Sequence, residues 1–244
     1  MTNKYIYFIA NWKMFGSLNT LNTLDKVINF VKKLKKNKVK IIYCPPNTLI
    51  NLLVNKFKNS PIMVGGQNCH EKQDYGAHTG QINSKMLKDV GAKYVILGHS
   101  ENRQLGENDK LINLKIKSTL NSKLKVIFCI GETLREKNKK VTKKVLAKQI
   151  LKGLKNVKNK KDILIAYEPV WAIGTGLTPK EIELSDVINF IKKRVKNVPV
   201  LYGGSVNTKN IQELKKIDNV DGFLIGGASQ VSKNLIDIIK KTFN

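Results

Sequence analysis

The sequence predicts a single (β/α)8 barrel, in which eight parallel strands close into a ring and helices cover its outside. Two observations lead to this fold class. Eight short apolar runs alternate with helical patterns, without a break in composition that would mark a second domain. The unusual residues directly follow the apolar runs, and barrels of this kind place their functional residues at those strand ends. We therefore expect one α/β domain over residues 1-244.

Each predicted strand is a short run rich in β-branched and aromatic side chains. Such a run is long enough for a buried strand and too short for a helix. The predicted strands span residues 5–10, 39–44, 62–67, 93–98, 125–130, 162–167, 198–202 and 222–225. In a parallel barrel, the residues that follow these runs meet at one end.

The helices are predicted from apolar residues that recur at helical spacing, with lysines between them. They cover residues 21–34, a segment with Leu49, Leu52 and Leu53, residues 111–120, 133–157 and 179–195, and a last segment from Val231 to Ile239. Residues 133–157 are rich in lysine, but the apolar period continues through them. We therefore predict a helix there and not a linker.

The formal net charge of +26 raises the possibility of a nucleic-acid partner. Only Arg103, Arg135 and Arg194 are arginines, whereas bidentate contacts with phosphate and bases favour arginine. The lysines form pairs on the polar sides of predicted helices, at residues 32–33, 35–36 and 139–140. We interpret them as solvated faces and expect no nucleic-acid partner. A field that attracts an anionic substrate is a second interpretation.

The cysteines and the apolar runs indicate a cytoplasmic protein. Cys44, Cys69 and Cys129 are odd in number and widely spaced, which suits a reducing compartment, and we expect Cys44 and Cys129 to be small core residues. The run at residues 5–10 is too short for a signal sequence or a membrane span, and no other segment qualifies. We therefore expect no membrane association.

Glu168 directly follows the sixth predicted strand and is the candidate base. Pro169 restricts the backbone of Glu168 to extended geometry. The apolar segment 170–172 then leads into Gly174-Thr175-Gly176, which can form a mobile loop over the carboxylate. A structural carboxylate beside a partly buried loop is the alternative interpretation, and Glu168 alone does not decide between the two.

Two other strand ends carry polar pairs with a spacing of two residues. Asn11 and Lys13 follow the first strand, and side chains two apart in a strand share one face, so Trp12 points the other way. His99 and Glu101 follow the fourth strand in the same arrangement. These side chains are therefore expected to join Glu168 at one end of the barrel.

The connection over residues 68–82 is long and polar, and such loops tend to be functional. It contains His70 and His78, which have no cysteine or carboxylate partners at ligand spacing, so we expect no metal site. Glycine pairs follow the seventh and eighth strands, at residues 203–204 and 226–227. Each pair alone suits an ordinary tight turn, but as the last two turns of a barrel they favour a phosphate site.

The chain resembles the triosephosphate isomerase family over nearly its whole length. The resemblance rests on many short motifs in the same order. They are Asn11-Trp12-Lys13-Met14, Cys44-Pro45-Pro46, Gly65-Gly66-Gln67-Asn68, Gly76-Ala77-His78-Thr79-Gly80, Leu97-Gly98-His99-Ser100-Glu101, Cys129-Ile130-Gly131-Glu132-Thr133, residues 166–176, Tyr202-Gly203-Gly204-Ser205-Val206 and Gly226-Gly227-Ala228-Ser229.

The resemblance implies a TIM barrel that interconverts dihydroxyacetone phosphate and D-glyceraldehyde 3-phosphate through an enediolate, without a cofactor. For this family a glutamate base, a neutral histidine and a closing loop are the standard description, and we carry them over residue by residue. Glu168 is then the base, and His99 is the electrophile. Asn11 and Lys13 hold the substrate oxygens, and Glu101 supports the site. The backbone amides expected to bind phosphate are those of Gly174, Ser205, Gly226 and Gly227.

The family resemblance also implies a homodimer, in which Thr79 enters a pocket near Asn11 and Lys13 of the other subunit. Some positions depart from the family pattern. The usual Ser-Glu-Arg-Arg run is Ser100-Glu101-Asn102-Arg103 here, followed by a loop one residue shorter. Gln81 replaces a usual glutamate, while His78 and Asn47 each replace a usual phenylalanine.

A different phosphate-binding barrel enzyme, such as an aldolase, is the other enzyme class that we consider. Such an enzyme needs a lysine at a strand end to form a Schiff base with its substrate. Lys13 is the one lysine that we identify in such a position.

Overall fold

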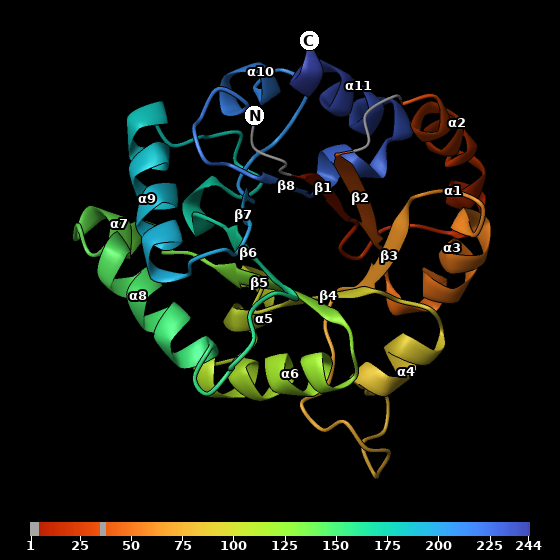
Figure 1. The fold of residues 1–244 in the computed structure, drawn as a ribbon, viewed down its shortest axis with the longest axis horizontal. Helices are drawn as coiled ribbons and strands as arrows, with labels where there is room; N and C mark the ends of the chain where they lie inside the picture. Colours follow the sequence, from red (N-terminus) through yellow and green to blue (C-terminus); the bar gives the residue numbers. More distant parts are fainter. Residues whose placement is uncertain (1–4, 35–37) are drawn as a thin grey trace.

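The computed structural model describes residues 5–34 and 38–244, and its eight parallel strands form a closed barrel (Figure 1). The strands are β1 (Ile6–Asn11), β2 (Val39–Cys44), β3 (Met63–Gly66), β4 (Tyr94–Leu97), β5 (Lys125–Ile130), β6 (Ile163–Tyr167), β7 (Val200–Tyr202) and β8 (Gly222–Ile225). Ile9 of β1 pairs with Ile42 of β2 and also with Leu224 of β8, which closes the ring. The predicted fold class is confirmed.

The helices surround the barrel, as Figure 1 shows. They are α1 (Leu18–Asn22), α2 (Asp25–Lys33), α3 (Ile50–Phe57), α4 (Ser84–Asp89), α5 (Ser100–Gln104), α6 (Asp109–Asn121), α7 (Leu134–Asn138), α8 (Thr142–Gly153), α9 (Glu181–Arg194), α10 (Ile211–Leu214) and α11 (Ser232–Phe243). Short 3₁₀ turns occur at η1 (Asn47–Leu49), η2 (Val170–Ala172) and η3 (Gly227–Gln230). The sequence patterns gave no bounds for α4, α5 or α10, which are all short.

Two predicted helices are each divided in two, so their predicted continuity is wrong. The segment 21–34 breaks at Thr23, whose hydroxyl donates to the carbonyl of Thr20 at 2.8 Å and competes with the helical bonding pattern. The segment 133–157 breaks because Lys140 takes a left-handed conformation with φ of 57°. Apolar periodicity continues across both breaks because the flanking helices face the same core. Two of the paired lysines, Lys35 and Lys36, lie outside the described residues.

Alternation along the strands produces two apolar layers. Side chains such as Ile9, Ile42 and Cys129 fill the inside of the barrel. Neighbours such as Phe8 and Trp12 point outward and pack with the helices. Trp12 therefore does point away from the barrel end that its neighbours face, as the alternation predicts. Cys44 and Cys129 are fully buried in the inner layer, as expected.

The connection over residues 68–82 has neither a helix nor a strand, as predicted, and it projects away from the barrel beyond α4 (Figure 1). Its base is closed by the amide of His70, which donates to the carbonyl of Ile82 at 2.8 Å. Within the loop, the rings of His70 and His78 stack with centroids 4.4 Å apart. The loop therefore projects from the rest of the described chain.

None of the helices in residues 5–34 and 38–244 combines the length and the apolar character that crossing a bilayer requires.

Candidate active site

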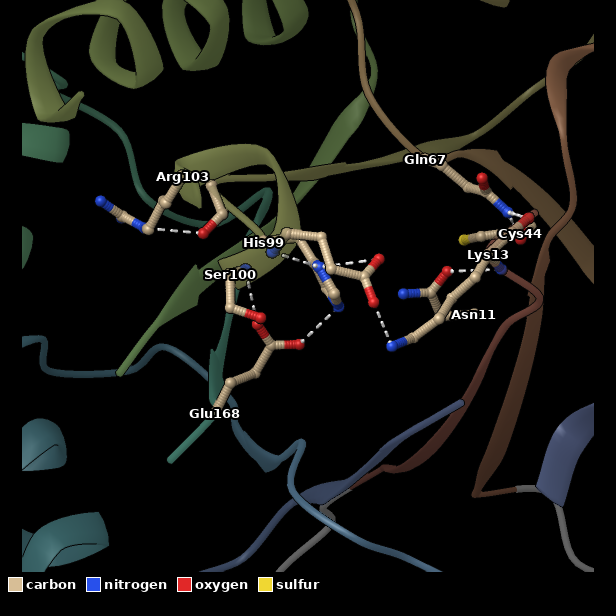
Figure 2. A network of polar contacts seen from close by, with 10 residues as sticks. Asn11, Lys13, Cys44, Gln67, His99, Ser100, Arg103 and Glu168 are labelled. Atoms are coloured by element: carbon tan, nitrogen blue, oxygen red, sulfur yellow. Dashed lines mark hydrogen bonds and ion pairs between the residues drawn. The ribbon is translucent and has the colours of Figure 1, made fainter. Parts of the chain in front are cut away.

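A cavity of about 220 Å³ opens at the carboxyl ends of the strands. Its lining comes from the ends of β1, β4, β6, β7 and β8. The lining residues include Asn11, Lys13, His99, Glu168, Ile173, Gly174, Ser205, Gly226 and Gly227. The sequence-predicted site residues are thus brought together, with the exception of Glu101, which contacts Lys13 and His99 from the side. Figure 2 shows the acid–base part of this site.

Glu168 follows β6 and is almost fully buried, with 2% of its surface exposed. Its Oε1 lies 3.3 Å from Nε2 of His99, and its Oε2 accepts a long bond of 3.4 Å from the amide of Ser100 (Figure 2). Burial raises the pKa of the Glu168 carboxyl above its ordinary value, while His99 and the Ser100 amide oppose that rise. The result is a desolvated carboxylate with increased affinity for a proton.

Two glycines make room for Glu168, and sequence reasoning gave neither of them this role. A Cβ on Gly203 would lie 2.8 Å from Cγ of Glu168, and one on Gly131 would lie 1.7 Å from the Glu168 carbonyl oxygen. Any larger residue at either position would displace Glu168. Their place directly after β5 and β7 was the available signal, but an ordinary turn gives the same pattern.

His99 precedes the first turn of α5 and has 5% of its surface exposed. Its Nδ1 accepts a bond of 3.2 Å from the amide of Glu101, so Nδ1 carries no proton in this arrangement. Its Nε2 faces Glu168, which requires the proton there. The contacts therefore specify a neutral imidazole that presents an N–H to the cavity side of Glu168.

Lys13 lies just beyond β1 in a left-handed conformation with φ of 55°, which is rare for a residue with a side chain. The side chain of Asn11 accepts the Lys13 amide at 3.1 Å, and Gln67 donates to the Lys13 carbonyl at 2.8 Å (Figure 2). Gln67 also donates to the carbonyl of Cys44 at 2.8 Å and so ties the ends of β1 and β2 together. Its supporting role was not predicted, because it depends on three strand ends that meet only in the fold.

The ammonium of Lys13 lies 2.5 Å from Oε1 of Glu101. Glu101 is about half exposed, so solvent screens this pair and its contribution to stability is small. The contact instead fixes where the lysine charge sits, which is at the edge of the cavity beside His99. Glu101 thus lies in contact with two of the predicted site residues, Lys13 and His99.

Arg103 is a second support that sequence reasoning missed. Its guanidinium donates to the carbonyls of Gly98 and Cys129, at 2.7 and 3.2 Å, and to the carboxylate of Asp109 at 2.7 Å. Gly98 directly follows β4 and Cys129 lies near the end of β5, so Arg103 holds together the strand ends that carry His99 and Gly131. Its signal in the sequence was weak because most of the other basic residues are solvated lysines.

Residues 170–176, which we call the lid, follow Glu168 directly. Ile173 and Gly174 line the cavity, and Gly174 and Gly176 have φ of 72° and 78°, where glycine is favoured. The indole of Trp171 donates to Oε1 of Glu132 at 2.8 Å. The hydroxyl of Tyr167 donates to the same carboxylate, and burial raises the pKa of Glu132. Glu132 therefore anchors the start of the lid, a role that the sequence alone did not indicate.

The glycine turns after β7 and β8 form another part of the cavity wall. Ser205, Gly226 and Gly227 line it together with Gly174 of the lid. Gly226 lies beside Lys13, since an added Cβ would come within 3.5 Å of the lysine Cε. The wall therefore combines exposed backbone with a nearby positive charge, which is suited to an anion. In the described part of the chain, no three His, Cys, Asp or Glu side chains cluster as metal ligands do.

Comparisons with known proteins agree on one family. The family model described as "Triosephosphate isomerase" matches residues 6–242. The triosephosphate isomerase of Endomicrobium trichonymphae is 39% identical over 95% of this chain and 96% of its own length. The one from Carboxydothermus hydrogenoformans is 40% identical over 96% and 97%. The crystal structure of the Bartonella henselae enzyme superposes with a TM-score of 0.88 at 32% identity, covering 98% of this chain and 99% of that one.

Proposed function

The chain belongs to the triosephosphate isomerase family, and on that premise we propose which part of the reaction each site residue performs. It is an isomerase that interconverts triose phosphates. The observation that carries the proposed mechanism is the contact of a desolvated glutamate with a neutral histidine inside one cavity. We treat residues 1-244 as one domain.

Glu168 is the base that removes the proton from the carbon next to the substrate carbonyl. A carbon-bound proton is weakly acidic, so its removal needs a base strengthened by exclusion of water. Burial of Glu168 does this, and its raised pKa is the sign of it. The bond to the Ser100 amide is long, so little is lost when the carboxylate turns from it toward the substrate.

His99 is the electrophile that polarises the carbonyl and moves protons between the two oxygens of the enediolate. Its Nδ1 is occupied by the Glu101 amide, so the Nε2–H is the group that can donate. The developing negative charge also needs a fixed cation and a neutral donor. Lys13 and Asn11, at the end of β1, supply the two.

The phosphate of the substrate binds the backbone amides of Gly174, Ser205, Gly226 and Gly227. All four residues line the same cavity, and Lys13 adds positive charge close to Gly226. Because Gly174 belongs to the lid, phosphate binding draws the lid over the site. A closed lid excludes water and protects the enediolate from losing its phosphate.

The chain functions as a homodimer in the cytoplasm. The loop over residues 68–82 projects from the barrel, and large apolar side chains near the first strand end are exposed, among them Met14 and Leu18 at 100% and 67%. A second copy would cover such surface when Thr79 enters the region near Asn11 and Lys13. The cysteines of the described residues are unpaired and buried, in keeping with a reducing compartment.

A coupled assay tests the activity directly. The purified chain should convert glyceraldehyde 3-phosphate into dihydroxyacetone phosphate without added metal or cofactor. Borohydride treatment in the presence of dihydroxyacetone phosphate should leave no adduct on Lys13, whereas an aldolase would be trapped as a secondary amine. Binding to nucleic acid should be weak and steeply dependent on salt, as expected for solvated lysines alone. An adduct on Lys13 without isomerisation would contradict the proposed mechanism and would indicate an aldolase.

A further inference from the structure

Trp171, in the lid, is held by a group that has no place in the chemistry above. The ammonium of Lys137 lies 3.5 Å from the centroid of the Trp171 ring, well within the range of a cation–π contact. The same ammonium is 3.4 Å from Oε2 of Glu183. Lys137 comes from α7, Trp171 from η2 and Glu183 from α9, so one side chain joins three separate elements.

The indole is fixed on its edge as well as on its face. Its N–H donates to Glu132 at 2.8 Å, and Glu132 is itself buried and bonded to the hydroxyl of Tyr167. The carboxylate on the edge and the ammonium on the face hold the ring in one orientation. Lys137 also opposes the rise that burial gives to the pKa of Glu132, which helps to keep that carboxylate ionised as an acceptor.

The position of Lys137 is itself well determined. Thr133 and Glu136 form a capping box at the start of α7, in which the Thr133 hydroxyl accepts the Glu136 amide and the Glu136 carboxylate accepts the Thr133 amide. The amide of Lys137 donates to the carbonyl of Thr133 at 2.9 Å. The short helix therefore presents its lysine from a fixed backbone.

A cavity of about 420 Å³ adjoins this contact, and Trp171, Glu132, Lys137, Lys140 and Glu183 are among its lining residues. An indole without the lysine on its face could tilt into this space. The next residues along the lid, Ile173 and Gly174, line the active-site cavity, so a tilt of Trp171 displaces the part of the lid that meets the substrate.

We propose that Lys137 is a positioning residue for the isomerase reaction, which fixes the start of the lid through the face of Trp171. The inference rests on the proposed role of the lid. Lys137 does not touch the substrate, and it acts by keeping the first residues of the lid in register with the cavity. Its contribution is of the size of one partly exposed cation–π contact, which corresponds to a two- to fivefold effect, roughly, on a rate or an equilibrium.

The test compares Lys137→Met and Lys137→Gln with Lys137→Arg, which keeps the charge, and with Lys140→Met. Lys140 lines the same cavity but has no ring contact or ion pair in the described part of the chain. Acrylamide quenching of tryptophan fluorescence reports on Trp171, because the other tryptophan, Trp12, is fully buried. We expect quenching to rise in the two neutral variants and to stay at the wild-type level in Lys137→Arg and Lys140→Met.

Kinetics provide the second measurement. The neutral variants should lose about two- to fivefold in kcat/KM and release more methylglyoxal per turnover, and Lys137→Arg should recover both. Unchanged quenching and unchanged methylglyoxal in both neutral variants overturn the proposal. Equal losses in Lys140→Met overturn it too, since they would point to a general effect of charge. The quenching measurement needs no activity, so an inactive wild-type chain would refute the isomerase mechanism without deciding the role of Lys137.

Discussion

The end of β6 and the tip of the loop over residues 68–82 differ in how well the rest of the same chain buries and contacts their side chains. Glu168 is 2% exposed and has contacts with His99 and Ser100, and the glycines around it fit its side chain. Tyr75, in the loop, is 74% exposed. The loop is closed at its base by one backbone bond, and its tip projects from the barrel.

This difference suggests separate roles, with the end of β6 involved in the reaction and the loop in the association of two copies. The acid–base groups are assembled within one chain, since every side chain proposed for the reaction lines one cavity or contacts a residue that does. The base of the loop is held by its own chain, through Asn68 and Cys69, but residues 74–77 and 79–81 are exposed, so the tip needs another surface to bury it. Changes at the end of β6 should therefore alter the rate, and changes in the loop should alter the association of two copies.

The largest effect is expected from Glu168→Gln. The substitution keeps the shape of the side chain and removes the proton acceptor, so kcat should fall by at least ~10²-fold, the scale of a positioned general base. Steady-state kinetics with glyceraldehyde 3-phosphate measure it. The sedimentation profile should be unchanged, which would confirm that this region does not govern assembly. Near-normal turnover would remove Glu168 from its role.

Deletion of residues 173–176 should have the next largest effect. Without these residues of the lid the barrel should still fold, but isomerisation should drop by at least about tenfold, and a larger share of the substrate should leave as methylglyoxal. Circular dichroism checks the fold, and product analysis measures the partition. Unchanged isomerase activity in the deletion variant would show that residues 173–176 do not act as a lid.

The sequence was sufficient for the strands and for the polar groups that line the cavity at their ends. Glu168 before a proline, and the polar pairs at Asn11 and His99, are local signals that the fold only needed to bring together. Gly131 and Arg103 were out of reach because their function lies in distances between strand ends. The break at Lys140 was missed for a local reason, since apolar spacing does not record the backbone conformation of a residue.

A positive charge added to the loop should weaken the association of two copies, whereas the substitution at the end of β6 should not. Wild-type protein should sediment as a dimer at micromolar concentration, and Thr79→Lys should shift it toward monomer, because it brings a second cation near Lys13 of the other copy. Asn138→Lys adds the same charge on exposed α7 and is the matched control. A fully active wild-type monomer at micromolar protein would contradict the dimer.

The stability of the fold should be lowered by the burial of the ionised Glu168 carboxylate. Burial raises the pKa of Glu168, so the native state holds the proton more tightly than the unfolded chain, whose carboxyl titrates near about 4.3. Stability is therefore lost as pH rises from that value through the raised native pKa. Glu168→Gln should melt about 2–4 °C higher than wild type at neutral pH, the shift that ~1 kcal/mol gives in a domain of this size.

The same experiment at acidic pH is its own control. Well below the unfolded-state pKa of about 4.3, both states of wild-type Glu168 are protonated, so the advantage of Glu168→Gln should disappear. A variant that is less stable than wild type at neutral pH would mean that the contacts of the carboxylate outweigh its desolvation. Glu168 would then contribute to stability as well as to rate.

The last comparison concerns Gln81 in the loop and Asn102 in α5. In the family that the sequence resembles, a glutamate and an arginine at these positions commonly pair across the interface, and here both charges are absent. Loss of one partner strands a charge, whereas replacement of both can be nearly neutral. We therefore expect the two amides of opposite subunits to meet directly or through water, since each can donate and accept.

Gln81→Glu should accordingly weaken the dimer by about tenfold in its dissociation constant, or ~1.4 kcal/mol. Its carboxylate would be buried against an amide and without a counter-charge. Adding Asn102→Arg should restore the affinity if the shorter loop after Arg103 lets the two groups reach each other. Sedimentation of the single and double variants measures the coupling. If Gln81→Glu tightens the dimer, the loop meets a positive surface other than Asn102, and the amide pair is wrong.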